Sequence, residues 1–141
     1  MLNGIHDVII FLDDLDGDMF IDLFFDIVLS LIHILKLHIC GDLNPVLELV
    51  ARTGADIIDL DYMVDMEKAA GLFPKSSCIC GNFNPVDVLY LGDAALVRRE
   101  VLRCMDIGRL NPNMISPGCE IPRDASPENV LAIHQAIVEE N

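Results

Sequence analysis

The chain has 141 residues, 52% of them hydrophobic, and 9 Lys and Arg against 23 Asp and Glu give a formal net charge of −14. This length is typical of a single domain, expected to span residues 1–141, and the hydrophobic content excludes an intrinsically disordered chain. The negative charge would repel nucleic-acid phosphates and anionic lipids, so no binding to nucleic acid or to a membrane is expected. The odd number of cysteines and the lack of a recognisable secretory leader indicate reduced thiols or metal ligands in a cytoplasmic protein.

The amino-terminal segments are strongly apolar. Residues 5–12 predict a buried strand, and the acidic residues 13–18 predict a loop after it. Residues 19–35 are apolar enough to raise the question of a membrane helix. Asp22 and Asp26 interrupt this segment, each costing roughly 2.5 to 3.5 kcal/mol near a bilayer centre, and the remainder is shorter than the ~20 residues that a span needs. A buried amphipathic helix is therefore predicted over residues 19–35.

From residue 37 onward, short strands and helices alternate. Asn44 and Pro45 predict the cap and first residue of a helix that ends at Gly54, and Asn84 and Pro85 repeat this signal after a later strand. Strands are expected over residues 5–12, 37–40, 57–61, 77–80 and 114–116. Further helices are expected over about 63–70, over 93–108 and from residue 126 onward.

Alternating strands and helices with short connections predict an α/β fold with a parallel sheet. Five strands are more than half of an eight-stranded barrel. The expected architecture is therefore a partial (β/α)8 TIM barrel of about five parallel strands with their helices.

A candidate metal site follows from His38, Cys40 and Cys119. His38 and Cys40 are two residues apart on a predicted strand, so both side chains lie on the same face near its carboxyl end. Cys119 follows the last predicted strand in a similar place. Two thiolates and one imidazole are typical of a catalytic zinc site with one position open. The opposing interpretation is that these are ordinary buried cysteines, since 79 positions between Cys40 and Cys119 is not a zinc-finger spacing.

Four further residues are weaker candidates. Cys78 and Cys80 share the same two-residue spacing, but no histidine or other cysteine lies at a readable spacing nearby, so small thiols of the core or barrel interior are predicted. Asn82 and Asp87 belong to the same strand-turn-helix unit as these two cysteines. Pocket-lining roles and roles in the turn or helix cap are both open for these two side chains.

Three blocks of sequence carry a family resemblance, namely HICGDLNPVLELVARTGADIIDLDYMVDM, ICGNFNPVDVLYLGD and SPGCEIPRDASPENVLAI. Together they resemble the carboxyl-terminal part of the uroporphyrinogen decarboxylase superfamily, over about residues 5 to 137. Within it they are most similar to the zinc-dependent methylcobamide:coenzyme M methyltransferases. This resemblance assigns zinc to His38, Cys40 and Cys119, and implies that the carboxylate of Asp61 holds the fourth position until substrate arrives. Asp59, which shares a strand face with Asp61, is the other candidate for a displaceable ligand or for a partner of a ligand.

The resemblance implies a methyltransferase whose zinc lowers the pKa of a thiol substrate such as coenzyme M. The resulting thiolate would take a methyl group from a corrinoid (cobalamin) carried by a separate protein, because this chain has no recognisable corrinoid-binding module. The corrinoid protein and the thiol are thus the expected partners, and Zn²⁺ and the corrinoid the expected cofactors.

Two other functions remain open. True decarboxylases of the superfamily resemble Gly-His-Gly-Ile where this chain has Gly118-Cys119-Glu120-Ile121, which argues against porphyrinogen decarboxylation without removing it. Members of the family are about twice as long, so the chain could also be a fragment, a degenerate copy or a non-catalytic partner subunit. Unpaired sheet edges would then favour a homo-oligomer or a complementary barrel half as partner.

Overall fold

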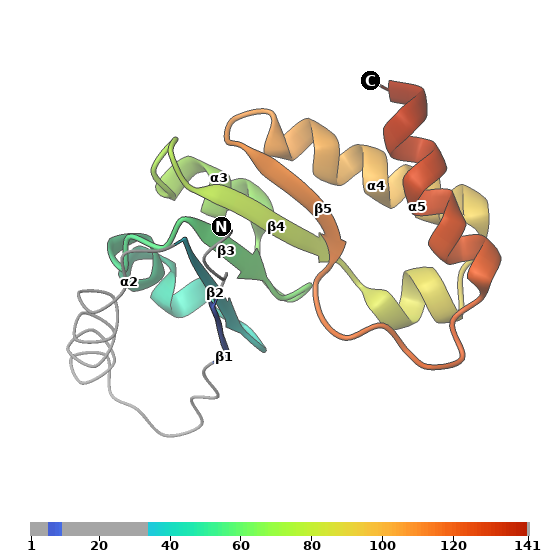
Figure 1. The fold of residues 1–141 in the computed structure, drawn as a ribbon, viewed down its shortest axis with the longest axis horizontal. Helices are drawn as coiled ribbons and strands as arrows, with labels where there is room; N and C mark the ends of the chain where they lie inside the picture. Colours follow the sequence, from blue (N-terminus) through green and yellow to red (C-terminus); the bar gives the residue numbers. More distant parts are fainter. Residues whose placement is uncertain (1–5, 10–33, 141) are drawn as a thin grey trace, which may run out of the picture.

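The computed structural model describes residues 6–9 and 34–140 (Figure 1). They form one five-stranded sheet in which every strand is parallel to its neighbour and the strands follow chain order. The strands are β1 (His6–Ile9), β2 (Leu35–Ile39), β3 (Ile57–Leu60), β4 (Cys78–Phe83) and β5 (Asn113–Pro117). All five predicted strands are therefore present. The expectations for residues 10–33, including the loop and most of the apolar helix, lie outside the described residues.

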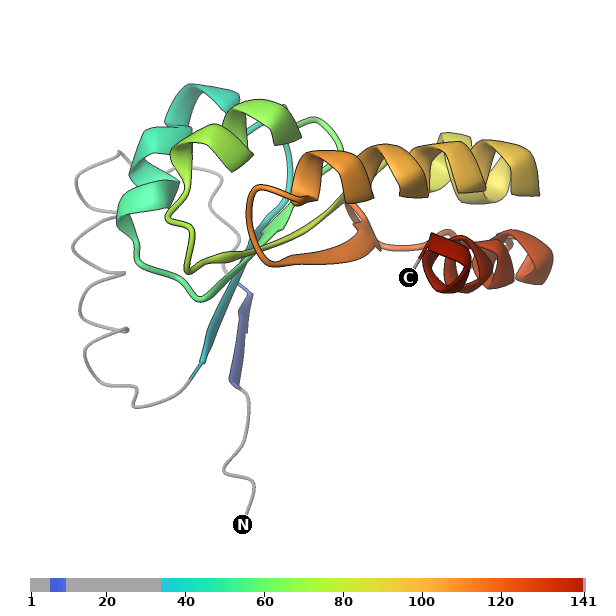
Figure 2. The ribbon, with the colours of Figure 1, turned by 90° about the horizontal axis from the view of Figure 1, so that it is seen from above.

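The connections between strands are helical. They comprise the 3-10 helix η1 (Asn44–Val46), α2 (Leu47–Arg52), α3 (Met66–Leu72), the short π-helix η2 (Pro85–Tyr90), α4 (Ala94–Gly108) and α5 (Pro127–Glu140). Figure 2 shows α2, α3 and α4 on the same side of the sheet, while α5 packs on α4 and η2. In the part of the chain that is described, no helix is long and apolar enough to cross a membrane.

The strands separate an apolar face from a polar one. On β2, Leu35, Leu37 and Ile39 are buried toward the helices, while Lys36 and His38 alternate with them and are only half-buried. Ile58 and Leu60 of β3 continue the buried face. The core therefore lies between the sheet and its helices, and the opposite face carries the polar side chains.

Two predicted caps are confirmed, and several predicted boundaries are wrong. Asp93 caps α4 by accepting a hydrogen bond from the Leu96 amide, and Asn84 caps η2, both as predicted. β2 begins at Leu35, so the helix predicted over residues 19–35 does not include that residue, which alternates with Leu37 and Ile39 on the buried face of the strand. β4 does not stop at Cys80 but continues to Phe83, and α3 runs from Met66 through Gly71 to Leu72.

Asn44 also departs from its prediction, because its side chain caps no helix. Its Oδ1 accepts a hydrogen bond from the Asp65 amide at 2.9 Å, and its Nδ2 donates to the Met63 carbonyl at 3.0 Å. The residue therefore ties the loop after β2 to the loop after β3. A local capping pattern could not reveal these two partners.

Candidate metal centre

The three predicted ligands converge at the carboxyl end of the sheet. His38 lies near the end of β2, Cys40 follows that strand directly, and Cys119 lies two residues after β5. One potential ligand atom from each residue lies within 4.8 Å of the others, and this is the one such group of histidine, cysteine and acidic residues found among residues 6–9 and 34–140. The structure thus brings together side chains that are 79 positions apart in the chain.

The distances between these atoms suit a tetrahedral metal ion. His38 Nε2 lies 3.2 Å from Cys40 Sγ, and Cys40 Sγ lies 3.9 Å from Cys119 Sγ. Ideal zinc–nitrogen and zinc–sulfur bonds at tetrahedral angles would separate such pairs by about 3.5 Å and about 3.8 Å. The three donors therefore fit zinc with little movement. Cys40 is exposed and the other two are half-buried, so the site faces solvent on one side.

The orientation of His38 is set by β3. Its Nδ1 lies 3.1 Å from the Asp59 backbone oxygen, which leaves Nε2 directed at Cys40. The Asp59 carboxylate lies farther away, with Oδ2 3.7 Å from Nδ1, because Lys36 Nζ holds the same oxygen at 2.9 Å. A histidine that donates Nδ1–H to a carbonyl has its other nitrogen available as a metal ligand.

The metal-free Cys40 thiol is held in its protonated form. Partial desolvation at the protein surface raises the pKa of Cys40, and the adjacent Cys119 thiol together with the charges of Asp61 and Asp59 raises it further. A metal ion would have to displace this proton, so binding would become tighter as the pH rises.

Asp61 lies close to the site but outside the group of three. Its side chain is 3% exposed, and both carboxylate oxygens are engaged by backbone amides: Oδ2 by Gly41 at 2.9 Å and Oδ1 by Met63 at 3.0 Å. The alternation that paired Asp59 with Asp61 ends with β3 at Leu60. Asp61 therefore belongs to the loop that follows the strand.

Asn82 and Asp87 have structural partners. The buried Asn82 amide donates to the backbone oxygens of Asp61 at 3.1 Å and Val64 at 2.7 Å. Asp87 accepts from Asn84 Nδ2 at 2.8 Å at the start of η2. Cys80 is buried within β4 and Cys78 half-buried, as predicted for interior thiols, and neither joins the metal-ligand group.

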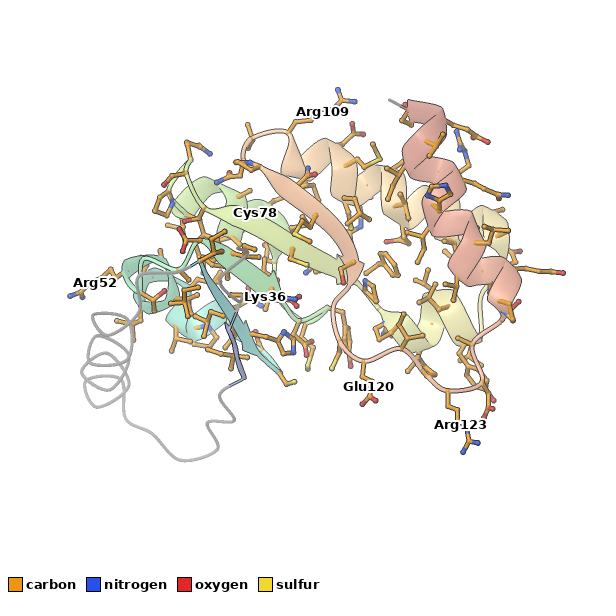
Figure 3. The ribbon with its side chains drawn as sticks, in the orientation of Figure 1. Lys36, Arg52, Cys78, Arg109, Glu120 and Arg123 are labelled. Carbon is orange, nitrogen blue, oxygen red and sulfur yellow. The ribbon has the colours of Figure 1, made fainter. Side chains whose placement is uncertain are left out.

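Sequence reasoning missed two residues that shape the site. Lys36 shares the β2 face of His38 (Figure 3), and the same two-residue period would have placed it there. Gly118 lies against the loop after β3, where a Cβ atom would stand 2.1 Å from the Tyr62 amide nitrogen. No pattern in the sequence predicts this close approach between Gly118 and Tyr62. The next residue after Cys119, Glu120, points outward from the loop (Figure 3).

The fold agrees with comparisons with known proteins. The family model of uroporphyrinogen decarboxylase matches residues 26–139, so the chain belongs to the uroporphyrinogen decarboxylase family. The methylcobamide:CoM methyltransferase MtbA of Methanosarcina acetivorans is 33% identical over 85 residues, which are 60% of this chain and 24% of that protein. The uroporphyrinogen decarboxylase of Paracoccus denitrificans is 35% identical over 85 residues, with the same coverage of this chain and 24% of the decarboxylase.

A solved methyltransferase from Methanosarcina mazei has the same fold. It superposes with a TM-score of 0.80 at 22% identity, covering 97% of this chain and 43% of that one. The predicted partial TIM barrel and the predicted family are thereby confirmed. The chain spans about a quarter of the length of the two curated relatives described above.

Proposed function

We propose that this chain carries the zinc-binding part of a methyltransferase that moves a methyl group from a methylated corrinoid protein to a thiol. The convergence of His38, Cys40 and Cys119 supports this proposal most directly. The similarity to methylcobamide:CoM methyltransferases favours coenzyme M as the thiol and a corrinoid protein as the donor. A cytoplasmic location belongs to the same proposal.

The donor set defines the chemistry. Zinc bound by two thiolates and one neutral imidazole would carry no net charge, so it would lower the pKa of a thiol substrate and leave the sulfur electron-rich. The methylated corrinoid of the partner protein would supply the methyl group to the thiol sulfur and would retain the electron pair of the Co–CH3 bond, while the thiol proton would go to solvent. The Asp59 carbonyl orients His38. This histidine and the two cysteines would hold zinc at the carboxyl ends of the strands.

Zinc content of the purified chain tests the proposal. We expect about one zinc per chain by elemental analysis, lost in His38→Ala and in Cys119→Ser because each removes a ligand. Cys78→Ser is the matched control, since Cys78 is half-buried on β4 and outside the ligand group. A folded chain without zinc, or equal zinc in all four proteins, would contradict the proposal.

A decarboxylase function is the second candidate, because uroporphyrinogen decarboxylases of Prochlorococcus marinus are 47% identical over 49 residues of this chain. That function predicts porphyrinogen binding that a chelator does not alter. A non-catalytic partner subunit predicts zinc binding without methyl transfer when methylated corrinoid protein and coenzyme M are supplied. Metal content and these two assays together separate the three functions.

A further inference from the structure

The loop after β3, residues 61–64, is held by the ends of three other strands. From β2, the Gly41 amide donates to the Asp61 carboxylate, and Asn44 bonds the Met63 carbonyl. From β4, Asn82 donates to the Asp61 and Val64 carbonyls. From the end of β5, Gly118 lies against the backbone of Tyr62. This loop therefore connects the segments that carry Cys40 and Cys119.

Asp61 is the central side chain of this arrangement. Gly41 has φ +99°, a conformation that other residues rarely adopt, and its amide points at Asp61 Oδ2. Because Gly41 is the next residue after Cys40, this bond fixes the direction in which the chain leaves β2. The second oxygen, Oδ1, accepts the Met63 amide within its own loop.

We propose that Asp61 is a positioning residue that holds Cys40 in place through the Gly41 amide, and that it does not occupy the fourth position on the metal. This inference rests on the proposed zinc site and differs from the role that the family resemblance implies. Turning either oxygen of the buried Asp61 to a metal would take from a backbone amide the acceptor that it has in this structure. The fourth position is then free for the thiol without displacement of a protein ligand.

Amide hydrogen exchange in the unaltered chain tests the proposal without any substitution. Positioning predicts that the Gly41 and Met63 amides are protected without metal and stay protected when zinc is added. A turn of Asp61 onto zinc would release both amides, and their exchange would accelerate at least tenfold. Unprotected amides in the metal-free chain, or acceleration with zinc, would overturn the proposal. If the chain bound no zinc, the proposed function alone would be wrong. The hydrogen bonds of Asp61 would still be tested, because protection of the Gly41 and Met63 amides can be measured without metal.

Thiol binding to the Co²⁺-loaded chain provides a second test, followed by sulfur-to-cobalt absorption with 2-mercaptoethanol as the probe. If Asp61 were a ligand, Asp61→Asn would remove a competitor and the apparent Kd of the thiol would fall about tenfold. Positioning predicts an unchanged or higher thiol Kd, together with a metal Kd raised about tenfold because Cys40 is less well held. A lower thiol Kd in Asp61→Asn overturns the proposal.

Asp56→Asn is the matched control for both effects. The Asp56 carboxylate also accepts a backbone amide of β2, that of Leu35 at 2.8 Å, but at the opposite end of the same two strands. We expect it to leave the Kd of metal and thiol unchanged. If Asp56→Asn weakened metal binding as much as Asp61→Asn, the effect of Asp61 would be general destabilisation, and the positioning role would be wrong.

Discussion

At the scale of single residues, charged and ionisable side chains lie close together on the polar face of the sheet. Lys36 Nζ pairs with the Asp59 carboxylate at 2.9 Å, and His38 Nδ1 faces the Asp59 backbone oxygen. Cys80 lies next to Asp59 in the strand register, and its burial, reinforced by the Asp59 charge, raises the pKa of the Cys80 thiol to about 11. A charged thiolate at this position is therefore disfavoured in the folded chain.

The raised pKa of Cys80 predicts a loss of stability at alkaline pH. The unfolded thiol loses its proton near the usual 9.0, whereas the folded one keeps it until about pH 11. Between these values the unfolded state binds fewer protons, so the free energy of unfolding falls as the pH rises. We expect urea unfolding at pH 8 and pH 10.5 to show a larger decrease for the unaltered chain than for Cys80→Ala, by about 1 to 2 kcal/mol. Equal decreases would show that Cys80 does not titrate this way.

At the scale of elements, the site depends on how strands end. β5 ends at Pro117, and the Gly118 amide then donates to the Phe83 carbonyl of β4 at 2.8 Å. This bond and the contact with Tyr62 turn the chain so that Cys119 reaches Cys40. Glycine is thus required at position 118, because a side chain there would collide with the backbone of Tyr62.

Gly118→Ala is expected to damage both stability and metal binding. The added Cβ would stand 2.1 Å from the Tyr62 nitrogen, which is backbone and cannot move aside without shifting the loop. We expect the free energy of unfolding to fall by roughly 1 to 3 kcal/mol, as for other overpacked sites. Because Cys119 moves with the loop, zinc affinity measured by chelator competition should fall at least tenfold.

Gly71→Ala provides the control for this substitution. Gly71 lies inside α3 with nothing within 4 Å of the added Cβ, so alanine should stabilise the helix by about 0.5 to 1 kcal/mol and leave zinc affinity unchanged. Unaltered zinc affinity in Gly118→Ala would mean that the loop does not position Cys119.

At the scale of the whole molecule, the described part is an open portion of a barrel. β1 pairs with β2 and β5 with β4, and among the described residues neither outer strand has a second neighbour. Unpaired edges and an uncovered polar face favour association with a second copy or with a complementary barrel half, both of which stay proposals. A metal ion bound by β2 and by the segment after β5 would join distant parts of this open sheet.

Zinc is therefore expected to raise the thermal stability of the chain. A metal that binds the folded form alone stabilises it by about 4 kcal/mol at a free concentration of 1,000 times Kd. For a chain of this size, that corresponds to a rise in Tm of roughly 10 °C. Calorimetry with and without zinc measures this rise in Tm, and adding a chelator should return the Tm to its metal-free value. No shift in the unaltered chain, or the same shift in Cys119→Ser, would contradict binding at this site.

Much of this protein follows from local pattern. The period of two along β2 placed His38 and Cys40 on one face, and the turn and cap residues predicted the alternation of strands and helices. A parallel sheet in chain order was then the expected result, and the family resemblance linked Cys119 to the other two. The strand and turn features depend on residues that are near one another in the chain, so they could be predicted without a structure, whereas the link to Cys119 came from the resemblance.

Tertiary structure alone decided which partners the polar groups of the loops find. Asn44 looked like a helix cap and instead bonds the loop after β3. The Asp61 carboxylate, for which the family resemblance implies a place on the metal, accepts the Gly41 amide from the loop after β2 and the Met63 amide within its own loop. A buried polar group takes whichever donor or acceptor the fold brings within reach. The partners of Asn44 and the Gly41 amide that bonds Asp61 lie 19 to 21 positions away in the chain, so no local pattern specifies them.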